Sequence, residues 1–269
     1  MFNLKRNIYK PAKRLKKRVV RKFRPLRDRI FFNRYLKNHT PVLVYQMGKV
    51  ASSSVTRSLS RQYPGVVLQA HYFNPNHKNW RIRRLYHWVM EETGPLNVIS
   101  LTRDPVGRNV SVFFQNFERN TGVPYHKANF SLEELKTIFL KKFAIGQPVH
   151  WFDNNIMGNF GIDVYVKPFP KCGHSTYTLK NIRLLVMRSE INDNEKVKVI
   201  KDFLRMDSFQ LVNRNISAQK EYASAYMDFK RNVKFPLDYI DKMCKSKYFN
   251  HFYDQDIIDS VKQKWSETK

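Results

Sequence analysis

Small and hydroxyl-bearing residues follow an apolar stretch in segment 42–55, which reads VLVYQMGKVASSSV. Gly48 lets the backbone approach a ligand closely, and the amides that open a following helix point at an anion. Lys49 adds a positive charge, and three serines add hydroxyl donors. The pattern predicts a phosphate- or sulfate-binding loop, although a strand–turn–helix with polar capping residues is the alternative. The predicted loop residues are Gly48, Lys49, Val50, Ala51, Ser52, Ser53 and Ser54.

This loop differs from the Walker A loop of ATP-binding proteins, GxxxxGK[ST]. The first glycine of that pattern would fall at Leu43, and its hydroxyl residue would fall at Val50. Without the hydroxyl, a magnesium ion loses its usual ligand. A nucleotide-dependent kinase is therefore the weaker alternative for this loop.

The elements that must position the loop alternate between strand and helix. Asp104 followed by Pro105 favours a helix start, and Ser131 with Glu134 forms a capping box before another. Alternating units of this kind predict a three-layer α/β fold with a central, mostly parallel sheet flanked by helices. Strands are predicted at residues 41–47, 66–71, 96–103 and 182–188. Helices are predicted at residues 50–63, 77–92, 104–120, 131–143, 193–204, 218–230, 236–249 and 254–265.

Ligands of such sheets bind beyond the carboxyl ends of the strands. Polar residues follow each of the four predicted strands at that end. We therefore expect them to gather at one edge of the sheet. They are Gly48 and Lys49, then His71, then Arg103, and finally Arg188 and Glu190.

Positive charge dominates the chain, with a formal net charge of +27. Residues 1–40 hold fifteen Lys or Arg against one acid, Asp28, a net charge of +14. An anionic partner is expected, but no nucleic-acid-binding motif accompanies the charge, so nucleic acid is not expected. We predict a basic arm over residues 1–38 and a single domain over residues 39–269.

The arm has no apolar run long enough for a transmembrane helix or a secretory signal. It is either a solvated arm or a surface element on anionic lipid. The two cysteines make no disulfide framework, and the histidines show no metal-ligand spacing, so no metal site is expected. These features favour a cytoplasmic protein, with peripheral attachment to the inner face of the membrane as an option. The candidate apolar anchors are Phe23, Ile30, Phe31, Phe32 and Tyr35.

Two motifs resemble sulfotransferases that use 3′-phosphoadenosine-5′-phosphosulfate (PAPS). QMGKVASSS, residues 46–54, resembles their 5′-phosphosulfate loop. LTRDPVGRNVSVFF, residues 101–114, resembles their 3′-phosphate element. The resemblance implies a P-loop-like sulfotransferase fold in which Arg103 and Ser111 hold the 3′-phosphate. A helical rise of about 1.5 Å per residue places Ser111 two turns into its helix, so that an anion can sit between the pair.

Further stretches resemble a bacterial, sulfotransferase-like family of capsular polysaccharide synthesis proteins. They are HWFDNNIMGNFGIDVY, LLVMRSEI, NRNISAQKEYASAYMDFK and SKYFNHFYDQDI, and the likeness spans roughly residues 41–265. It implies a nucleotide-closing loop around NISAQKEY, with Lys220 as a contact.

The resemblance implies in-line transfer of a sulfuryl group from PAPS to a carbohydrate hydroxyl, on a polysaccharide or glycolipid. A basic surface suits an acidic acceptor. Lys49 would stabilise the developing charge, and His71 would act as general base. Glu190 and Glu118 remain alternative bases, and the chemistry needs no metal. A non-catalytic polysaccharide-assembly protein on the same fold is a further alternative.

Overall fold

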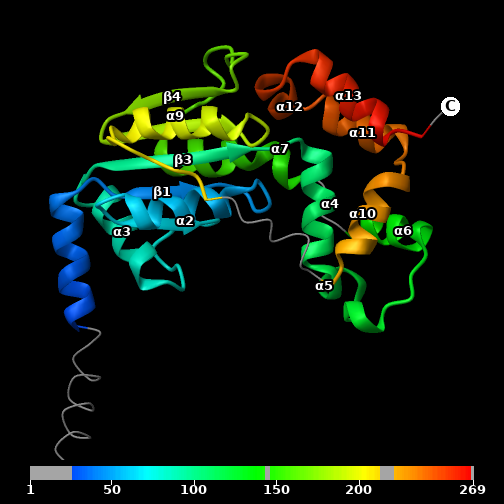
Figure 1. The fold of residues 1–269 in the computed structure, drawn as a ribbon, viewed down its shortest axis with the longest axis horizontal. Coiled ribbons are helices and arrows are strands. Elements are labelled where there is room, and N and C mark those ends of the chain that lie inside the picture. The colour runs from blue at the N-terminus through cyan, green and yellow to red at the C-terminus, as the bar shows by residue number, and fades with distance from the viewer. Residues whose placement is uncertain (1–25, 143–145, 213–220, 268–269) are drawn as a thin grey trace, which may run out of the picture.

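A five-stranded sheet organises the computed structural model, which describes residues 26–142, 146–212 and 221–267. The strand order is β2-β1-β3-β5-β4 (Figure 1). Four strands run parallel, and β4 pairs antiparallel with β5 at one edge. This confirms the predicted α/β class and the mostly parallel sheet. The strands are β1 (Val42–Tyr45), β2 (Val67–Ala70), β3 (Leu96–Thr102), β4 (His174–Leu179) and β5 (Ile182–Arg188).

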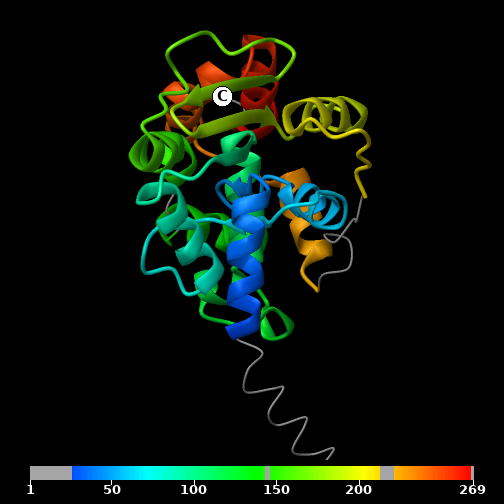
Figure 2. The same ribbon diagram turned by 90° about the vertical axis from the view of Figure 1, so that its left-hand side faces the viewer.

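The central strands β1 and β3 are rich in apolar residues because helices cover both faces of the sheet. Every residue of β1 and β3 is buried. Figure 2 shows α2 and α9 on one side of the sheet and α3 on the other. The crossover through α2 leads outward to β2, and the one through α3 leads back past β1 to β3. These helices are α2 (Ser52–Gln62), α3 (Trp80–Met90) and α9 (Asp193–Leu204).

A second helical layer extends from the end of β3. The helix α4 begins as predicted, since the Asp104 carboxylate accepts a hydrogen bond from the Gly107 amide at 2.6 Å and Pro105 occupies the first turn. Its far half packs in an aromatic core, where the Phe113 and Phe139 rings lie 5.5 Å apart. The elements of this layer are α4 (Pro105–Gln115), α5 (Phe117–Thr121), η1 (Tyr125–Lys127), α6 (Leu132–Lys142) and α10 (Ala223–Asn232).

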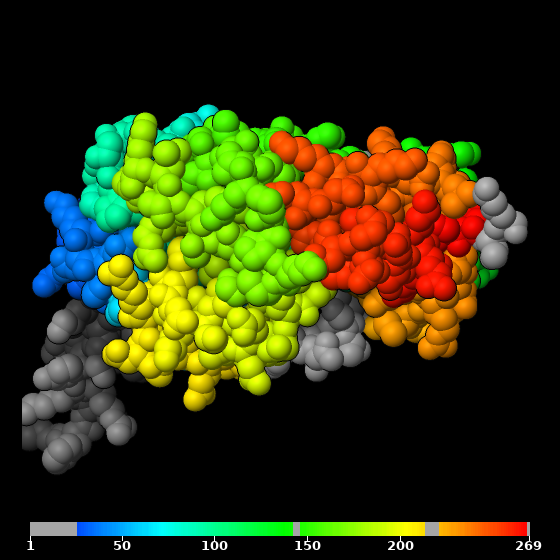
Figure 3. All heavy atoms as spheres, turned by 90° about the horizontal axis from the view of Figure 1, so that it is seen from above, coloured from blue at the N-terminus to red at the C-terminus, as the bar shows by residue number. Residues whose placement is uncertain are grey.

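The C-terminal helices close over the same end of the sheet. Figure 3 shows them, in orange and red, directly against the green segment that precedes β4. The rings of Phe169 and Phe252 lie 4.9 Å apart at this contact. The predicted helix at residues 236–249 is two helices, with a break at Ser246, which caps the second. The remaining elements are α7 (Gln147–Trp151), the π-helical turn η2 (Phe152–Met157), α8 (Gly158–Phe160), α11 (Leu237–Cys244), α12 (Lys247–Phe252) and α13 (Gln255–Trp265).

A helix over residues 26–38 precedes β1 and packs on the domain. Phe32 and Leu36 are buried, and the Phe32 ring meets the Trp80 ring edge-on at 5.2 Å. Phe23 lies outside the described residues. Within the described part of the chain, none of the helices combines the length and the apolar character needed to span a membrane.

Candidate anion-binding site

The loop between β1 and α2 has an unusual backbone. Lys49 (φ 72°) and Ala51 (φ 59°) both adopt the left-handed region. This region costs a non-glycine residue roughly 1–2 kcal/mol, and such strain concentrates at functional sites. Ala51 caps α2 without a side-chain hydrogen bond, and the first turn holds no acidic residue. The opening amides of α2 thus lack a side-chain cap, as an anion site requires.

Two arginines from the β3–α4 junction brace this loop. Arg103 Nη1 donates to the Lys49 carbonyl at 2.9 Å, and Arg108 Nε donates to the Gly48 carbonyl at 3.0 Å. Arg103 was a predicted site residue, whereas Arg108 was not. Arg108 lies one turn beyond the start of α4. This position brings its side chain back to the end of β3, beside Arg103. Its place in the RDPVGR segment was the only signal in the sequence.

Arg108 is a buried cation with neutral partners. The residue is 2% exposed, and its guanidinium also donates to Asn109 Oδ1 and Gln147 Oε1. No carboxylate pairs with it among the residues that the structure describes. Burial, with a further contribution from the charge of Arg103, lowers the pKa of Arg108 to about 10. The group therefore stays charged at neutral pH, and the site carries positive charge that a bound anion would compensate.

The C-terminal helices fix Arg103, one of the two residues predicted to hold the 3′-phosphate, by hydrogen bonds to its backbone. The Tyr248 hydroxyl accepts from the Arg103 amide at 3.0 Å and donates to the Arg103 carbonyl at 2.9 Å. Ser111 is buried two turns into α4. No hydrogen bond links it to Arg103 in the described ranges. Lys220 lies outside the described residues, so its predicted contact stays a prediction.

The serines of the loop divide into two environments. Ser52 is buried, and its hydroxyl accepts from Gln46 Nε2 at 2.6 Å. As an acceptor in that bond, the hydroxyl keeps its own proton to donate. Ser53 and Ser54 instead line a cavity of about 580 Å³ along α2. Its other lining residues are Thr56, Arg57, Ser60, Arg61, Gln69 and Val212.

His71, which directly follows β2, lies next to Gly48 of the loop. A Cβ built on Gly48 would lie 4.0 Å from His71 Cε1. His71 Nδ1 lies 2.8 Å from the Gln46 carbonyl oxygen. A carbonyl can only accept, so Nδ1 carries the proton and Nε2 of the neutral ring is an acceptor. This is the tautomer that a general base at Nε2 needs.

His71 and Gly48 line a second cavity of about 280 Å³. The polar wall of this cavity includes His150, Asn154 and Asn155, none of which was a predicted site residue. The asparagines lie on η2, and the Tyr45 hydroxyl donates to Asn155 Oδ1 at 2.8 Å. Single π-helical turns are frequent at functional sites. The remaining lining residues are Met47, Tyr72, Gly146, Gln147 and Trp151.

The alternative bases lie in different places. Glu190 accepts from the Asp104 amide at 3.2 Å and from the Tyr253 hydroxyl at 3.1 Å. The residue as a whole is exposed, but both carboxylate oxygens are held against the protein, and this desolvation raises the pKa of Glu190. Glu118 is exposed on α5, with the whole of α4 between it and Arg103. Over the described ranges, no group of His, Cys, Asp and Glu side chains could hold a metal ion.

Comparison with known proteins gives one match. Residues 125–254, just under half of the chain, match the model of a family described as "Putative capsular polysaccharide synthesis protein". The matched segment contains His150, η2 and Tyr248, and it begins after the loop, His71 and Arg103. Neither the curated proteins nor the solved structures contained a match. The match supports the predicted family resemblance over these residues.

Proposed function

We propose that the protein transfers a sulfuryl group from PAPS to a hydroxyl of a carbohydrate acceptor. The observation that carries the proposal is the pair Arg103 and Arg108, whose guanidinium groups donate hydrogen bonds to the loop carbonyls, with no carboxylate paired to Arg108 among the described residues. The similarity to capsular polysaccharide synthesis proteins supports a carbohydrate acceptor.

PAPS fits this charge distribution because it carries anions at both ends of its ribose. The 5′-phosphosulfate would bind the opening amides of α2, Lys49 and the loop hydroxyls. The cavity along α2, with Ser53 and Ser54 in its wall, offers room for the nucleotide. The 3′-phosphate would bind Arg103, with Ser111 and Lys220 as further contacts. Arginine suits this role because its planar fork matches phosphate oxygens.

The acceptor would enter the cavity lined by His71. Histidine, asparagine and aromatic side chains there can hydrogen-bond and stack on a sugar ring. The acceptor oxygen attacks sulfur as His71 Nε2 takes its proton, and the bond between sulfur and the 5′-phosphate oxygen breaks. The products are the sulfate ester and adenosine 3′,5′-bisphosphate. Lys49 would stabilise the charge that develops on the leaving oxygen.

Two alternatives make different predictions. A kinase with a Walker A loop takes a magnesium ligand from the residue after the lysine, but Val50 is apolar and fully buried. A non-catalytic assembly protein would not need a general base beside the loop, whereas the Gln46 carbonyl holds His71 in the tautomer suited to that role. Both observations favour the sulfotransferase.

Isothermal titration calorimetry tests the proposal with adenosine 3′,5′-bisphosphate and, separately, with ATP and magnesium. We expect the bisphosphate to bind, and Arg103→Ala to weaken binding by about tenfold or more, since hydrogen bonds to charged groups contribute about 1.5–3 kcal/mol. Arg119→Ala, an exposed arginine on α5, is the matched control and should bind as wild type does. Absence of bisphosphate binding, or equal binding by Arg103→Ala, would contradict the proposal. Preference for ATP with magnesium would favour the kinase.

A further inference from the structure

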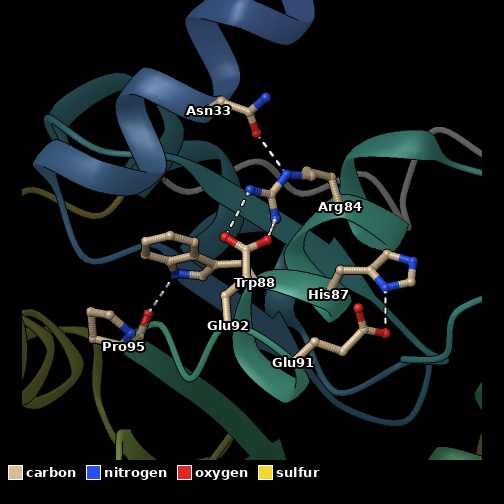
Figure 4. Close-up of polar contacts among 7 residues, drawn as sticks. All are labelled: Asn33, Arg84, His87, Trp88, Glu91, Glu92 and Pro95. Atoms are coloured by element: carbon tan, nitrogen blue, oxygen red, sulfur yellow. Dashed lines mark hydrogen bonds and ion pairs between the residues drawn. The ribbon is translucent and has the colours of Figure 1, made fainter.

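One side of the helix over residues 26–38 packs against the domain. Phe32 and Leu36 are buried in the core. Figure 4 shows Asn33 accepting a hydrogen bond from Arg84 Nε, at 2.6 Å, while the Arg84 guanidinium pairs with both carboxylate oxygens of Glu92. The position of the helix on the domain is therefore fixed by packing and by a charged network between Arg84 on α3 and Glu92 just beyond the end of α3.

Its other side exposes large apolar residues to solvent. Ile30 is 60% exposed, Leu26 57%, Phe31 49% and Tyr35 47%. In Figure 2 the helix stands in front of the rest of the described chain, and nothing described covers this outer side. We call these four residues together with Arg27, Arg34 and Lys37, which are also exposed, the outer face.

The charges of the outer face indicate what covers it. Basic side chains lie among the apolar ones, and the only acid of the helix is the half-buried Asp28. The preceding residues 1–25 hold eleven Lys or Arg and no acid. Apolar side chains interspersed with basic ones are the composition of elements that lie in the headgroup region of anionic membranes. We propose that the outer face is a docking surface for an anionic lipid bilayer.

Other occupants fit this face less well. A second copy of the chain would bring together two faces of the same positive charge, which opposes association. Nucleic acid would satisfy the arginines but would leave Ile30 and Phe31 without an apolar partner. A bilayer surface supplies both the anionic headgroups and the apolar boundary beneath them.

The proposed orientation leaves the anion site accessible. The helix leads into the start of β1, whereas the loop follows the end of β1, so the two lie at opposite ends of this strand. A membrane bound to the outer face would leave the carboxyl edge of the sheet directed away from the lipid. The docking proposal does not depend on the sulfotransferase proposal.

Vesicle co-sedimentation of the full chain tests the proposal. The probes are vesicles of phosphatidylcholine alone and vesicles containing one third phosphatidylglycerol, in about 0.1 M salt, where charge is screened beyond about 10 Å. The double variant Ile30→Glu/Phe31→Glu is compared with Val166→Glu/Met227→Glu. The control pair is also exposed, lies elsewhere on the molecule and changes the net charge equally.

We expect wild type to bind the anionic vesicles and not the neutral ones. The Ile30→Glu/Phe31→Glu variant should lose roughly tenfold or more in affinity, and the control pair much less, because only the former removes apolar contacts with lipid. Equal loss by both double variants, no loss by the first, or no binding by wild type would overturn the proposal. The proposal would also be overturned if light scattering showed that wild type is a dimer and that Ile30→Glu/Phe31→Glu dissociates it. Thermal melting and bisphosphate titration of the variants check separately that the fold and the anion site are intact.

Discussion

The guanidinium of Arg108 is buried between the loop and α4 with three neutral hydrogen-bond acceptors. Isolating a charge in this way is costly, and the pKa of about 10 expresses that cost. A bound anion would offset part of it. At the scale of single residues, we therefore propose that an anionic ligand completes the loop, in which Lys49 and Ala51 adopt left-handed backbone angles.

His71 carries the catalytic step of the proposal. We expect His71→Ala to lower turnover by about 10²–10⁴-fold, the usual contribution of a general base, while bisphosphate affinity stays near that of wild type. The measurement is the rate of adenosine 3′,5′-bisphosphate release from PAPS in the presence of a polysaccharide acceptor. His126→Ala, an exposed histidine, serves as control. Near-normal turnover of His71→Ala would refute the role of His71 as general base. Glu190 would then be the candidate base.

Glu190 gives a prediction about pH and stability. Its folded-state pKa is raised above the usual 4.5, so the folded protein binds its proton more tightly than the unfolded chain does. Stability from this group is present below pH 4.5 and is lost as pH rises through the raised pKa. We therefore expect the melting temperature of Glu190→Gln, relative to wild type, to increase as pH rises from about 4.5 to neutrality. A difference that is constant or decreases over that range would contradict the assigned shift.

At the scale of elements, what the sequence could predict depended on burial. The strands β1, β3 and β5 are largely buried and consist mostly of apolar residues, a pattern that sequence reasoning detects. β4 is an edge strand, HSTYTL, with exposed polar positions, and it was not predicted. The turn η2, FDNNIM, holds an aspartate and two asparagines, which are weak helix formers, and no helix was predicted over it. Its asparagines therefore gave no sign that they line the cavity with His71.

Truncation before and after the helix over residues 26–38 measures how much of the predicted arm stabilises the domain. Deleting residues 1–25 should leave the melting temperature nearly unchanged. Deleting residues 1–38 should lower the unfolding free energy by roughly 3–6 kcal/mol, because it removes the buried Phe32 and Leu36, each worth about 1.5–3 kcal/mol. Denaturant unfolding of both truncations measures this difference. Equal stability of the two truncated chains would show that the helix does not support the fold.

At the scale of the whole molecule, the two positively charged features lie at opposite ends of β1. The loop with Arg103 and Arg108 is at its carboxyl end, and the outer face of the helix over residues 26–38 is at its start. The net charge of +27 thus includes two separate features, for which we propose different anionic partners. Net charge alone could not separate them, because it records neither burial nor position.

A crystal structure of the protein with adenosine 3′,5′-bisphosphate would test the proposed nucleotide site by direct observation. We expect the 5′-phosphate within about 2.7–3.2 Å of the opening amides of α2, and the 3′-phosphate within the same distance of the Arg103 guanidinium. The nucleotide should extend into the cavity lined by Ser53 and Ser54. A bisphosphate bound elsewhere, with the loop between β1 and α2 making no contact to either phosphate, would contradict it.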